Sequence, residues 1–369
     1  MTNILITGSN GFVGKNLLEG LGKLDSANVF LFNRSSSAEE LDTYLANADV
    51  IYHLAGINRP VRPEDFQGNV ELTEQIIKGL KQNNKKPKII FASTIHALSD
   101  NDYGRSKKAA EEALIQFGSE TAADVYIFRL PNLFGKWCKP HYNSVVATFC
   151  HNISRDLEIT ISDPDQQLEL AYIDDVVKRL LAVLAQSEHS DGHYYSIEPT
   201  YSVTLGGLAN QLMEFKKIRS TSILPTLSDP FTKYLYSTYL SHLDRQDFAY
   251  PIQTFNDHRG SLFEAIKSKH AGQLFVSTTV KGVERGNHYH NTKVEKFCVI
   301  KGKALVKFRH IFEDESFTYT LSDEKITILD IPPGYTHAIE NISEDDLIVL
   351  FWANEIFDAS RPDTYPSQV

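Results

Sequence analysis

The sequence is poor in cysteine, and it lacks a long apolar run and an excess of positive charge. Its three cysteines, Cys138, Cys150 and Cys298, are scattered and odd in number, which argues against a disulfide framework and suits a reducing cytosol. No apolar stretch approaches the roughly 18 residues of a membrane-spanning helix, and no charged segment followed by an apolar one opens the chain. We therefore expect a cytoplasmic protein without membrane insertion.

The charge balance and the length narrow the possibilities further. A net charge of −10 argues against non-specific binding to nucleic acid or anionic membranes, so an anionic ligand would need a helix N-terminus or a few arginines. The 369 residues exceed what one hydrophobic core usually organises. We expect two globular domains.

The N-terminal half alternates between strand-like and helical patterns. Apolar strand-like runs lie at residues 3–7, 28–33, 49–53, 88–92 and 124–129, with helical patterns such as 11–21 and 70–82 between them. This alternation predicts an α/β domain, with a Rossmann-type, doubly wound parallel sheet covered by helices on both faces.

A glycine motif, G-x-x-G-x-x-G, follows the first expected strand and precedes the first expected helix. The first glycine allows a tight turn, the second lets a pyrophosphate approach the backbone, and the third lets the helix pack on the sheet. The pattern predicts a dinucleotide site made by Gly8, Asn10, Gly11, Phe12, Val13 and Gly14.

This spacing resembles the extended short-chain dehydrogenase/reductase (SDR) family. Further family motifs follow in order: Leu54-Ala55-Gly56, Tyr103-Gly104-Arg105-Ser106-Lys107, the R-x-x-N-x-x-G of residues 129–135, and residues 172–176. The resemblance implies that Leu54, Ala55 and Gly56 contact the cofactor and that Asn132 binds a nucleotide-sugar.

Tyr103 and Lys107 lie four residues apart and so share a helix face. A tyrosine with a pKa of about 10 is a poor acid at neutral pH unless a nearby cation lowers that pKa. We expect Lys107 to supply this charge and to bind the nicotinamide ribose, and Thr94 to bind the same substrate oxygen as Tyr103. Ser93 is the alternative hydroxyl.

The end of the second strand should select the cofactor. An acid there would bind the ribose 2′-hydroxyl, but the sequence has Asn33-Arg34. An arginine can form charge-assisted hydrogen bonds with a 2′-phosphate, which favours NADPH over NADH. The alternative is an exposed arginine without a cofactor role.

The pattern changes to two-residue periodicity near residues 245–254. Short strand-like runs follow at residues 273–279, 295–300, 304–310, 316–321, 325–331 and 347–353. Close spacing of short strands suggests a sandwich or barrel. We predict a reductase domain over residues 1–245 and an all-β domain over residues 246–369.

Two motifs of this second part carry metal-ligand types. One reads G-x5-H-x-H-x4-E-x6-G from Gly282 and contains His288, His290 and Glu295; the other, P-x-G-x2-H-x3-N, contains His337. Strand alternation puts the first two histidines on one face. Three imidazoles and a carboxylate suit a divalent cation, and we expect Zn²⁺, with iron, manganese and nickel left open.

Both motifs resemble the signatures of the cupin family, with every ligand position filled and Ile326 where a glycine usually opens the second motif. A cupin is a double-stranded β-helix, or jelly-roll barrel. Residues 257–264 and 285–289 further resemble cupin 3,5-epimerases of dTDP-4-keto-6-deoxy sugars, which places Arg259 among the substrate-binding residues. The base of those metal-free enzymes corresponds to His288, here assigned to the metal, so the base stays open.

Taken end to end, the chain resembles bifunctional capsular polysaccharide biosynthesis enzymes of the UDP-N-acetyl-L-fucosamine route. The resemblance implies that the cupin epimerises C3 of a UDP-4-keto-6-deoxy-N-acetylhexosamine. The SDR domain would reduce C4 with NADPH to UDP-2-acetamido-2,6-dideoxy-L-talose. We also expect a homodimer.

Two other functions remain open. One is a nucleotide-sugar epimerase or dehydratase that retains NAD and returns the hydride. The other is a non-catalytic cupin that serves as a structural or sensing module.

Overall fold

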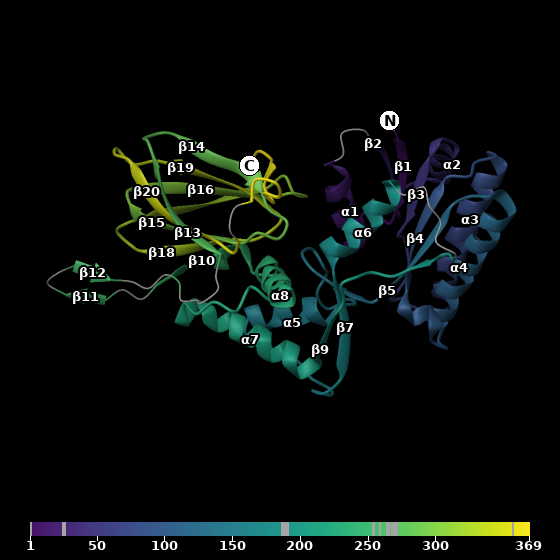
Figure 1. The fold of residues 1–369 in the computed structure, drawn as a ribbon, viewed down its shortest axis with the longest axis horizontal. Coiled ribbons are helices and arrows are strands. Elements are labelled where there is room, and N and C mark those ends of the chain that lie inside the picture. Colours follow the sequence, from purple (N-terminus) through teal and green to yellow (C-terminus); the bar gives the residue numbers. More distant parts are fainter. Residues whose placement is uncertain are drawn as a thin grey trace. The chain divides into compact units, whose positions relative to one another are not determined.

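The computed structural model describes residues 2–23, 27–185, 192–252, 255–257, 260–262, 266, 272–355 and 358–369. The chain divides into two compact units, which are interleaved in sequence (Figure 1). The first contains residues 1–144 and 167–203, and the second contains residues 145–166 and 204–369.

The first unit is built on a six-stranded sheet with the order β2-β1-β3-β4-β5-β8, in which every pair is parallel. Its strands are β1 (Thr2–Thr7), β2 (Ala27–Phe32), β3 (Val50–His53), β4 (Lys88–Thr94), β5 (Val125–Leu130) and β8 (Tyr194–Tyr195). The strand order reverses between β1 and β3, and ligands of such sheets bind at the carboxyl ends of the strands at this point. The predicted Rossmann-type sheet is confirmed.

Helices cover both faces of this sheet. α2 (Ala38–Asn47), α3 (Gly68–Gln82) and α4 (Asp102–Thr121) lie on one face, and α1 (Phe12–Leu21) and α6 (Ile173–Ala185) contact each other on the other (Figure 1). Strand alternation accounts for the two cores: Leu5, Ile51, Ile89 and Ile127 are buried against α2, α3 and α4. On the opposite face, the Tyr52 hydroxyl donates to the carbonyl of Leu180 in α6 at 3.1 Å.

Smaller elements complete the first unit. A second sheet contains β6 (Asn132–Phe134), β7 (Gln167–Tyr172) and β9 (Tyr201–Thr204). Two 3₁₀ turns, η1 (Pro63–Gln67) and η2 (Ile95–Leu98), precede α3 and α4.

The second unit combines helices with two antiparallel sheets. Its helical elements are α5 (Val145–Ser154), α7 (Leu205–Thr221), α8 (Pro230–Ser241) and the 3₁₀ turn η3 (Arg245–Asp247). One sheet has the order β10-β18-β15-β20-β13, with β10 (Ala249–Pro251), β18 (Thr327–Ile331), β15 (Glu295–Lys301), β20 (Leu347–Ala353) and β13 (Gln273–Thr279). The other has the order β17-β16-β19-β14-β21, with β17 (Ser316–Ser322), β16 (Lys303–His310), β19 (Tyr335–Asn341), β14 (Glu284–Tyr289) and β21 (Tyr365–Pro366).

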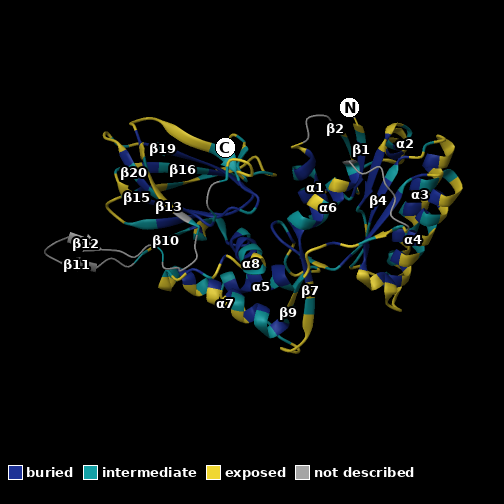
Figure 2. Ribbon diagram, in the orientation of Figure 1, coloured by how far each residue is buried: buried dark blue, intermediate teal, exposed yellow. Residues whose placement is uncertain are grey.

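The inner sides of these sheets form an apolar core, seen as buried segments in Figure 2. Phe297, Val299, Val306 and Phe308 are each at most 3% exposed. A separate pair, β11 (Phe255–Asp257) and β12 (Gly260–Leu262), is antiparallel. The predicted all-β region is confirmed as antiparallel sheets consistent with a cupin.

The helices of residues 204–241 pack in the same unit as the C-terminal sheets, whereas the sequence prediction assigned them to the first domain. Two ion pairs contribute: Arg219 of α7 lies 3.3 Å from Asp330 of β18, and Lys233 of α8 lies 2.7 Å from Glu355. Asp330 is 1% exposed, so its carboxylate needs such partners. The predicted boundary between the reductase domain and the cupin domain, at residues 245/246, concerns function and stays a prediction.

Across the described ranges, no helix is both long enough and apolar enough to cross a bilayer. None of the three cysteines forms a disulfide.

Candidate active site and metal centre

The glycine-rich loop between β1 and α1 is held against the end of β3. Gly8 has φ +72°, and a Cβ there would lie 2.8 Å from both Cα and N of Ala55. A Cβ on Gly14 would lie 2.4 Å from the carbonyl oxygen of Gly8. The structure thus brings together the predicted Gly8, Gly14 and the loop of Leu54, Ala55 and Gly56, at the point where the strand order reverses.

The N-terminus of α1 is open to a ligand. Its N-cap residue is Gly11, which offers no side-chain cap to the first backbone N–H groups. Asn10 and Gly11 are exposed, and Phe12 and Val13 are half-buried. Uncapped N–H groups at a helix N-terminus form an anion site, so these residues fit the pyrophosphate of a dinucleotide.

Asn33 and Arg34 lie in the turn that follows β2. The Asn33 Oδ1 accepts hydrogen bonds from the Ser35 backbone N at 3.0 Å and the Ser35 hydroxyl at 2.6 Å, so this side chain shapes the turn. Arg34 is exposed beside it. Their contacts with a cofactor stay predictions.

Thr94 ends β4, and Tyr103 lies in the first turn of α4, which begins after the N-cap Asn101. The Thr94 hydroxyl lies close enough to Tyr103 to affect the pKa of its phenol. Burial raises the pKa of Tyr103, the Thr94 hydroxyl opposes this, and the nearby Tyr142 raises the pKa further. Tyr103 is therefore a protonated donor, and Thr94 is its neighbouring hydroxyl.

The expectation that Lys107 lowers the pKa of Tyr103 is wrong for this structure. The Lys107 Nζ donates to the carbonyl of Ala92 at 2.8 Å and lies 4.0 Å from the centroid of the Phe91 ring. Burial lowers the pKa of Lys107 to about 7, against the opposing effect of Glu111. Burial is therefore the largest effect on the pKa of both Tyr103 and Lys107.

Ser93, the alternative hydroxyl, points to a different partner. It donates to the carboxylate of Glu111, which also accepts hydrogen bonds from Arg129, at 3.0 and 3.2 Å from Nε and at 2.5 Å from Nη2. Ser93 is thus held by Glu111, whereas Thr94 is the hydroxyl that affects the pKa of Tyr103. Arg129, the first residue of the R-x-x-N motif, joins β5 to α4 through this buried glutamate.

Asn69 is a residue that the sequence prediction missed. Its Oδ1 accepts from the Ile57 backbone N at 2.6 Å, and its Nδ2 donates to Ser106 at 3.0 Å. It therefore ties the loop after Gly56 to α4 next to Lys107. No spacing signals this role, because Asn69 and Ser106 are 37 residues apart.

Fewer contacts describe the surroundings of the residues predicted to bind the substrate. Asn132 is exposed at the start of β6, opposite Leu170. Two cations flank the ring of Tyr142: Arg59 at 5.9 Å and Lys139 at 5.5 Å from its centroid. Arg259 lies outside the described residues.

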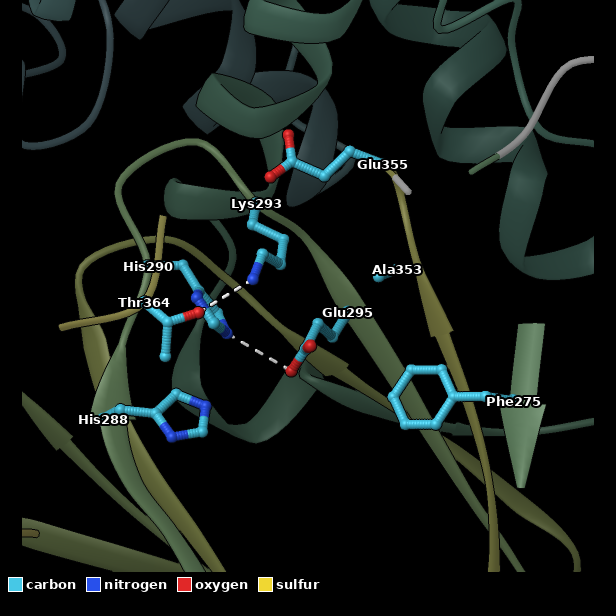
Figure 3. A pocket seen from close by; sticks show the side chains of 8 residues that line it. All are labelled: Phe275, His288, His290, Lys293, Glu295, Ala353, Glu355 and Thr364. Carbon is cyan, nitrogen blue, oxygen red and sulfur yellow. Dashed lines mark hydrogen bonds and ion pairs between the residues drawn. The ribbon is translucent and has the colours of Figure 1, made fainter. Parts of the chain in front are cut away.

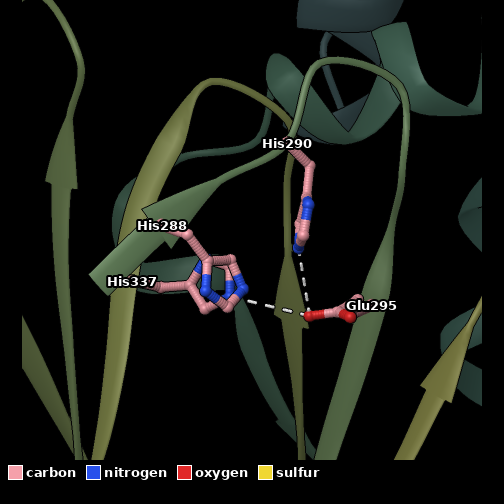
Figure 4. A group of neighbouring side chains, drawn as sticks. All are labelled: His288, His290, Glu295 and His337. Carbon is pink, nitrogen blue, oxygen red and sulfur yellow. Dashed lines mark ion pairs between the residues drawn. The ribbon is translucent and has the colours of Figure 1, made fainter. Parts of the chain in front are cut away.

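The four predicted metal ligands converge in the second unit (Figure 4). His288, His290, Glu295 and His337 each offer a ligand atom, and these atoms all lie within 4.8 Å of one another. A bulge between Gly286 and His288 shifts the register of β14 against β19. The first two histidines come from β14 and its end, the glutamate from the start of β15, and His337 from β19.

Within this cluster, Nε2 of His290 lies 3.3 Å, and Nε2 of His337 3.6 Å, from the same oxygen of Glu295. Both nitrogens are buried, and neither has a hydrogen-bond partner among the described residues. Burial would raise the pKa of Glu295, but the two imidazoles hold it well below its usual range. Burial also lowers the pKa of His288, to about 4. Orphaned imidazole nitrogens facing an ionised carboxylate are what a divalent cation requires.

A cavity of about 220 Å³ opens beside the cluster (Figure 3). Lys293 directs its ammonium group toward this space. The lining residues are Phe275, His288, His290, Lys293, Glu295, Ala353, Glu355 and Thr364.

Comparisons with known proteins agree with this architecture. Residues 4–197 match the NAD dependent epimerase/dehydratase family, and residues 255–365 match the polysaccharide biosynthesis C-terminal domain. The chain therefore belongs to the NAD dependent epimerase/dehydratase family.

Two relatives match over essentially the whole length. The chain is 44% identical over 367 residues to the UDP-2-acetamido-2,6-beta-L-arabino-hexul-4-ose reductase of Pseudomonas aeruginosa, covering 99% of this chain and 98% of the relative. It is 42% identical to a crystal structure of the capsular polysaccharide assembling protein CapF from Staphylococcus aureus, which covers 100% of both chains with a TM-score of 0.67. A UDP-N-acetylglucosamine 4-epimerase from Bacillus cereus shares the fold, with 23% identity, a TM-score of 0.52, and coverage of 58% of this chain and 82% of that one.

Proposed function

We propose that this protein is a bifunctional, NADPH-dependent nucleotide-sugar enzyme of surface polysaccharide biosynthesis. The cupin epimerises C3 of a UDP-4-keto-6-deoxy-N-acetylhexosamine, and the SDR region reduces the C4 ketone, giving UDP-2-acetamido-2,6-dideoxy-L-talose. The observation that carries the proposal is that one chain holds both a neighbouring Thr94 and Tyr103 in the region with the dinucleotide loop and a cluster of three histidines and a glutamate. The names of the two full-length relatives support the substrate and the pathway.

In the reduction, the cofactor supplies a hydride to C4 of the sugar. Tyr103 donates a proton to the C4 oxygen, which completes the conversion of ketone to alcohol. Thr94 fixes the position of that oxygen by a second hydrogen bond, and Lys107 orients the ribose of the cofactor. Burial of Tyr103 keeps the donor protonated at neutral pH.

The residues present fit NADPH. The uncapped N-terminus of α1 suits the pyrophosphate, and Gly8 and Gly14 leave no space for a side chain. We propose that Arg34, which is exposed after β2, pairs with the 2′-phosphate. Asn33 holds the turn that presents it.

For the epimerisation, we propose that His288, His290, Glu295 and His337 hold one divalent metal, with Zn²⁺ as the expected ion. When bound, such a metal supplies Lewis acidity at a carbonyl oxygen. The cavity beside the cluster can receive the keto sugar, and its lining adds the Lys293 ammonium as a positive group near a developing enolate. Asn132 and Arg259 are proposed to bind the nucleotide-sugar.

The two reactions have a chemical order. The C3–H bond is acidic only while C4 is a ketone, so epimerisation must precede reduction. Reduction then removes the ketone and fixes the new configuration at C3. A homodimer and a cytoplasmic location are part of the same proposal.

The deciding experiment incubates the UDP-4-keto-6-deoxy sugar with the full-length protein in D₂O. The parent with NADPH should oxidise one NADPH per product, and NMR should show the L-talo product with deuterium at C3. Tyr103→Phe without NADPH should still exchange the C3 proton, and His337→Ala should not. Deuterium entering C3 only in the reductase-competent protein would overturn the division of labour.

The same experiment tests the competing function. Membership of the NAD dependent epimerase/dehydratase family favours, as the alternative, an enzyme that retains NAD and returns its hydride. Turnover without consumption of added NADPH, together with NAD that co-purifies, would establish that alternative.

A further inference from the structure

The C-terminal segment, residues 358–369, runs beside the proposed metal ligands. Its strand β21 pairs with β14, placing Pro366 opposite His288 and Tyr365 opposite Tyr289. The Ser367 backbone N donates to the carbonyl of Asn287 at 2.9 Å. The last residues of the chain therefore form the strand that pairs with β14, which carries the proposed ligand His288.

Just before β21, the side chain of Asp363 organises the loop that joins His290 to Glu295. One carboxylate oxygen accepts from the Asn291 backbone N at 3.1 Å. The other accepts from the Thr292 backbone N and hydroxyl, both at 2.9 Å, and from the Lys293 backbone N at 2.6 Å. Four donors from three consecutive residues thus converge on one carboxylate.

The backbone of the same residue reaches a ligand directly. The carbonyl oxygen of Asp363 lies 2.6 Å from Nδ1 of His290. An imidazole that donates from Nδ1 to a carbonyl keeps the lone pair on Nε2, and Nε2 of His290 is the buried nitrogen that faces Glu295. Asp363 has φ +39°, a left-handed conformation that this network of hydrogen bonds stabilises.

The residues on either side of Asp363 hold the cationic group of the cavity. The Lys293 Nζ donates to the carbonyl of Pro362 at 2.8 Å. It also donates to the Thr364 hydroxyl at 2.9 Å (Figure 3). Three consecutive residues of the tail therefore set the positions of one metal ligand and one ammonium group.

We propose that residues 362–364 are a positioning strap for the metal centre, with Asp363 as the positioning residue. Its carboxylate folds the loop of residues 291–293, and its carbonyl fixes the tautomer and direction of His290. The inference rests on the proposed metal centre, and it adds that metal affinity depends on a carboxylate that does not touch the metal.

The test compares variants of the full-length protein by competition for Zn²⁺ with a chelator of known affinity. Asp363→Asn replaces one accepting oxygen with a donor that faces an N–H group, so Zn²⁺ affinity should fall about 10- to 100-fold. Asp358→Asn is the matched control, because Asp358 lies in the same segment and, among the described residues, its carboxylate accepts from Ser360 and Arg361 and not from the loop of residues 291–293. It should bind Zn²⁺ as the parent does.

A spectroscopic readout separates positioning from general stability. Proton–nitrogen correlation spectra of the Zn²⁺-loaded parent should show His290 with a proton on Nδ1 and the metal on Nε2. Asp363→Asn should show a mixture of tautomers for this ring, while the ring of His337, whose Nδ1 faces the carbonyl of Tyr335, stays unchanged.

Each outcome decides the proposal. Parent-like affinity and a single His290 tautomer in Asp363→Asn, or equal losses in Asp363→Asn and Asp358→Asn, would overturn it. If Asp363→Asn does not fold, Thr292→Val, which removes one of the four donors, should weaken binding about three- to tenfold, and unchanged affinity would overturn the proposal. Absence of Zn²⁺ binding in the parent would instead reject the metal centre itself.

Discussion

Gly286 of β14 lies against the backbone of His337 in β19, so closely that a Cβ on this glycine would be 2.8 Å from the His337 carbonyl oxygen. Its φ of +106° is also strained for a residue with a side chain. A glycine two residues before His288 therefore lets the strands that carry two proposed ligands approach each other.

Gly286→Ala should separate β14 from β19. We expect loss of metal affinity and a decrease of roughly 1–3 kcal/mol in the free energy of unfolding, measured by chelator competition and denaturant titration. Gly282→Ala is the control, because Gly282 has φ +74° and a Cβ at this position would have no atom of the described residues within 4 Å. The Gly282→Ala variant should have the same kind of backbone strain but keep the parental metal affinity. Equal metal affinities in Gly286→Ala and Gly282→Ala would contradict a role of Gly286 in bringing the ligand strands together.

Tyr103→Phe should lower the rate of ketone reduction by about 10²–10⁴, the usual contribution of a general acid, while NADPH affinity changes little. The rate is followed by NADPH oxidation and the affinity by fluorescence titration. Tyr44→Phe, a tyrosine stacked on Phe30 at 5.0 Å between centroids, should retain the parental rate. A Tyr103→Phe variant that works at more than half the parental rate would rule out the assignment.

Arg34→Ala should weaken the binding of NADPH by about 10- to 150-fold and leave that of NADH nearly unchanged, because only NADPH offers the 2′-phosphate. The measurement is the dissociation constant of NADPH and of NADH for the parent and for Arg34→Ala. Arg62→Ala removes a different exposed arginine, which pairs with Asp65 at 3.1 Å, and should affect neither cofactor. Equal weakening of NADPH and NADH by Arg34→Ala would contradict the role of this residue.

His53 should make the stability of the first unit sensitive to acid. Burial, aided by Lys107, lowers the pKa of His53 to about 3, and its ring is held by the hydroxyls of Thr7 at 2.8 Å and Thr73 at 2.9 Å. The unfolded chain takes up a proton at this histidine below pH about 6.5, whereas the folded chain does not. The free energy of unfolding therefore falls as the pH drops from 6.5 toward 3, by about 1.4 kcal/mol per pH unit.

Denaturant titrations at pH 7 and pH 5 test this effect. His53→Gln should lose roughly 2 kcal/mol less stability than the parent between these values, because it no longer takes up that proton on unfolding. His96→Gln, which changes an exposed histidine, should behave as the parent does. The same loss in all three proteins would show that other groups dominate.

The strands of the C-terminal sheets could be predicted closely from the sequence. β13 and β20 have the predicted bounds, since each is an apolar run with turn residues at its ends. The short strands β6, β7 and β9 were not predicted, because the sheet joins segments that are distant in the sequence and each strand carries little pattern of its own.

The four metal-ligand candidates could be named because their spacing follows two strand pairs, and the structure brings all four together. Asp363 could not, because it acts on His290 from 73 residues away and no local pattern marks it. The pKa of Tyr103 was predicted with the wrong sign for a related reason. Spacing places Lys107 on the right helix face, but only the packed structure shows that Ala92 and Phe91 take up its ammonium group and that burial controls the tyrosine.

The interleaving of the two units has a consequence for synthesis on the ribosome. α5 leaves the ribosome after β6, but its helical partners α7 and α8 are made more than 40 residues later. β6 must likewise wait for β7, which follows α5. Neither unit can therefore complete its core from one continuous stretch of nascent chain, and both should reach protease resistance only after residue 204 has emerged.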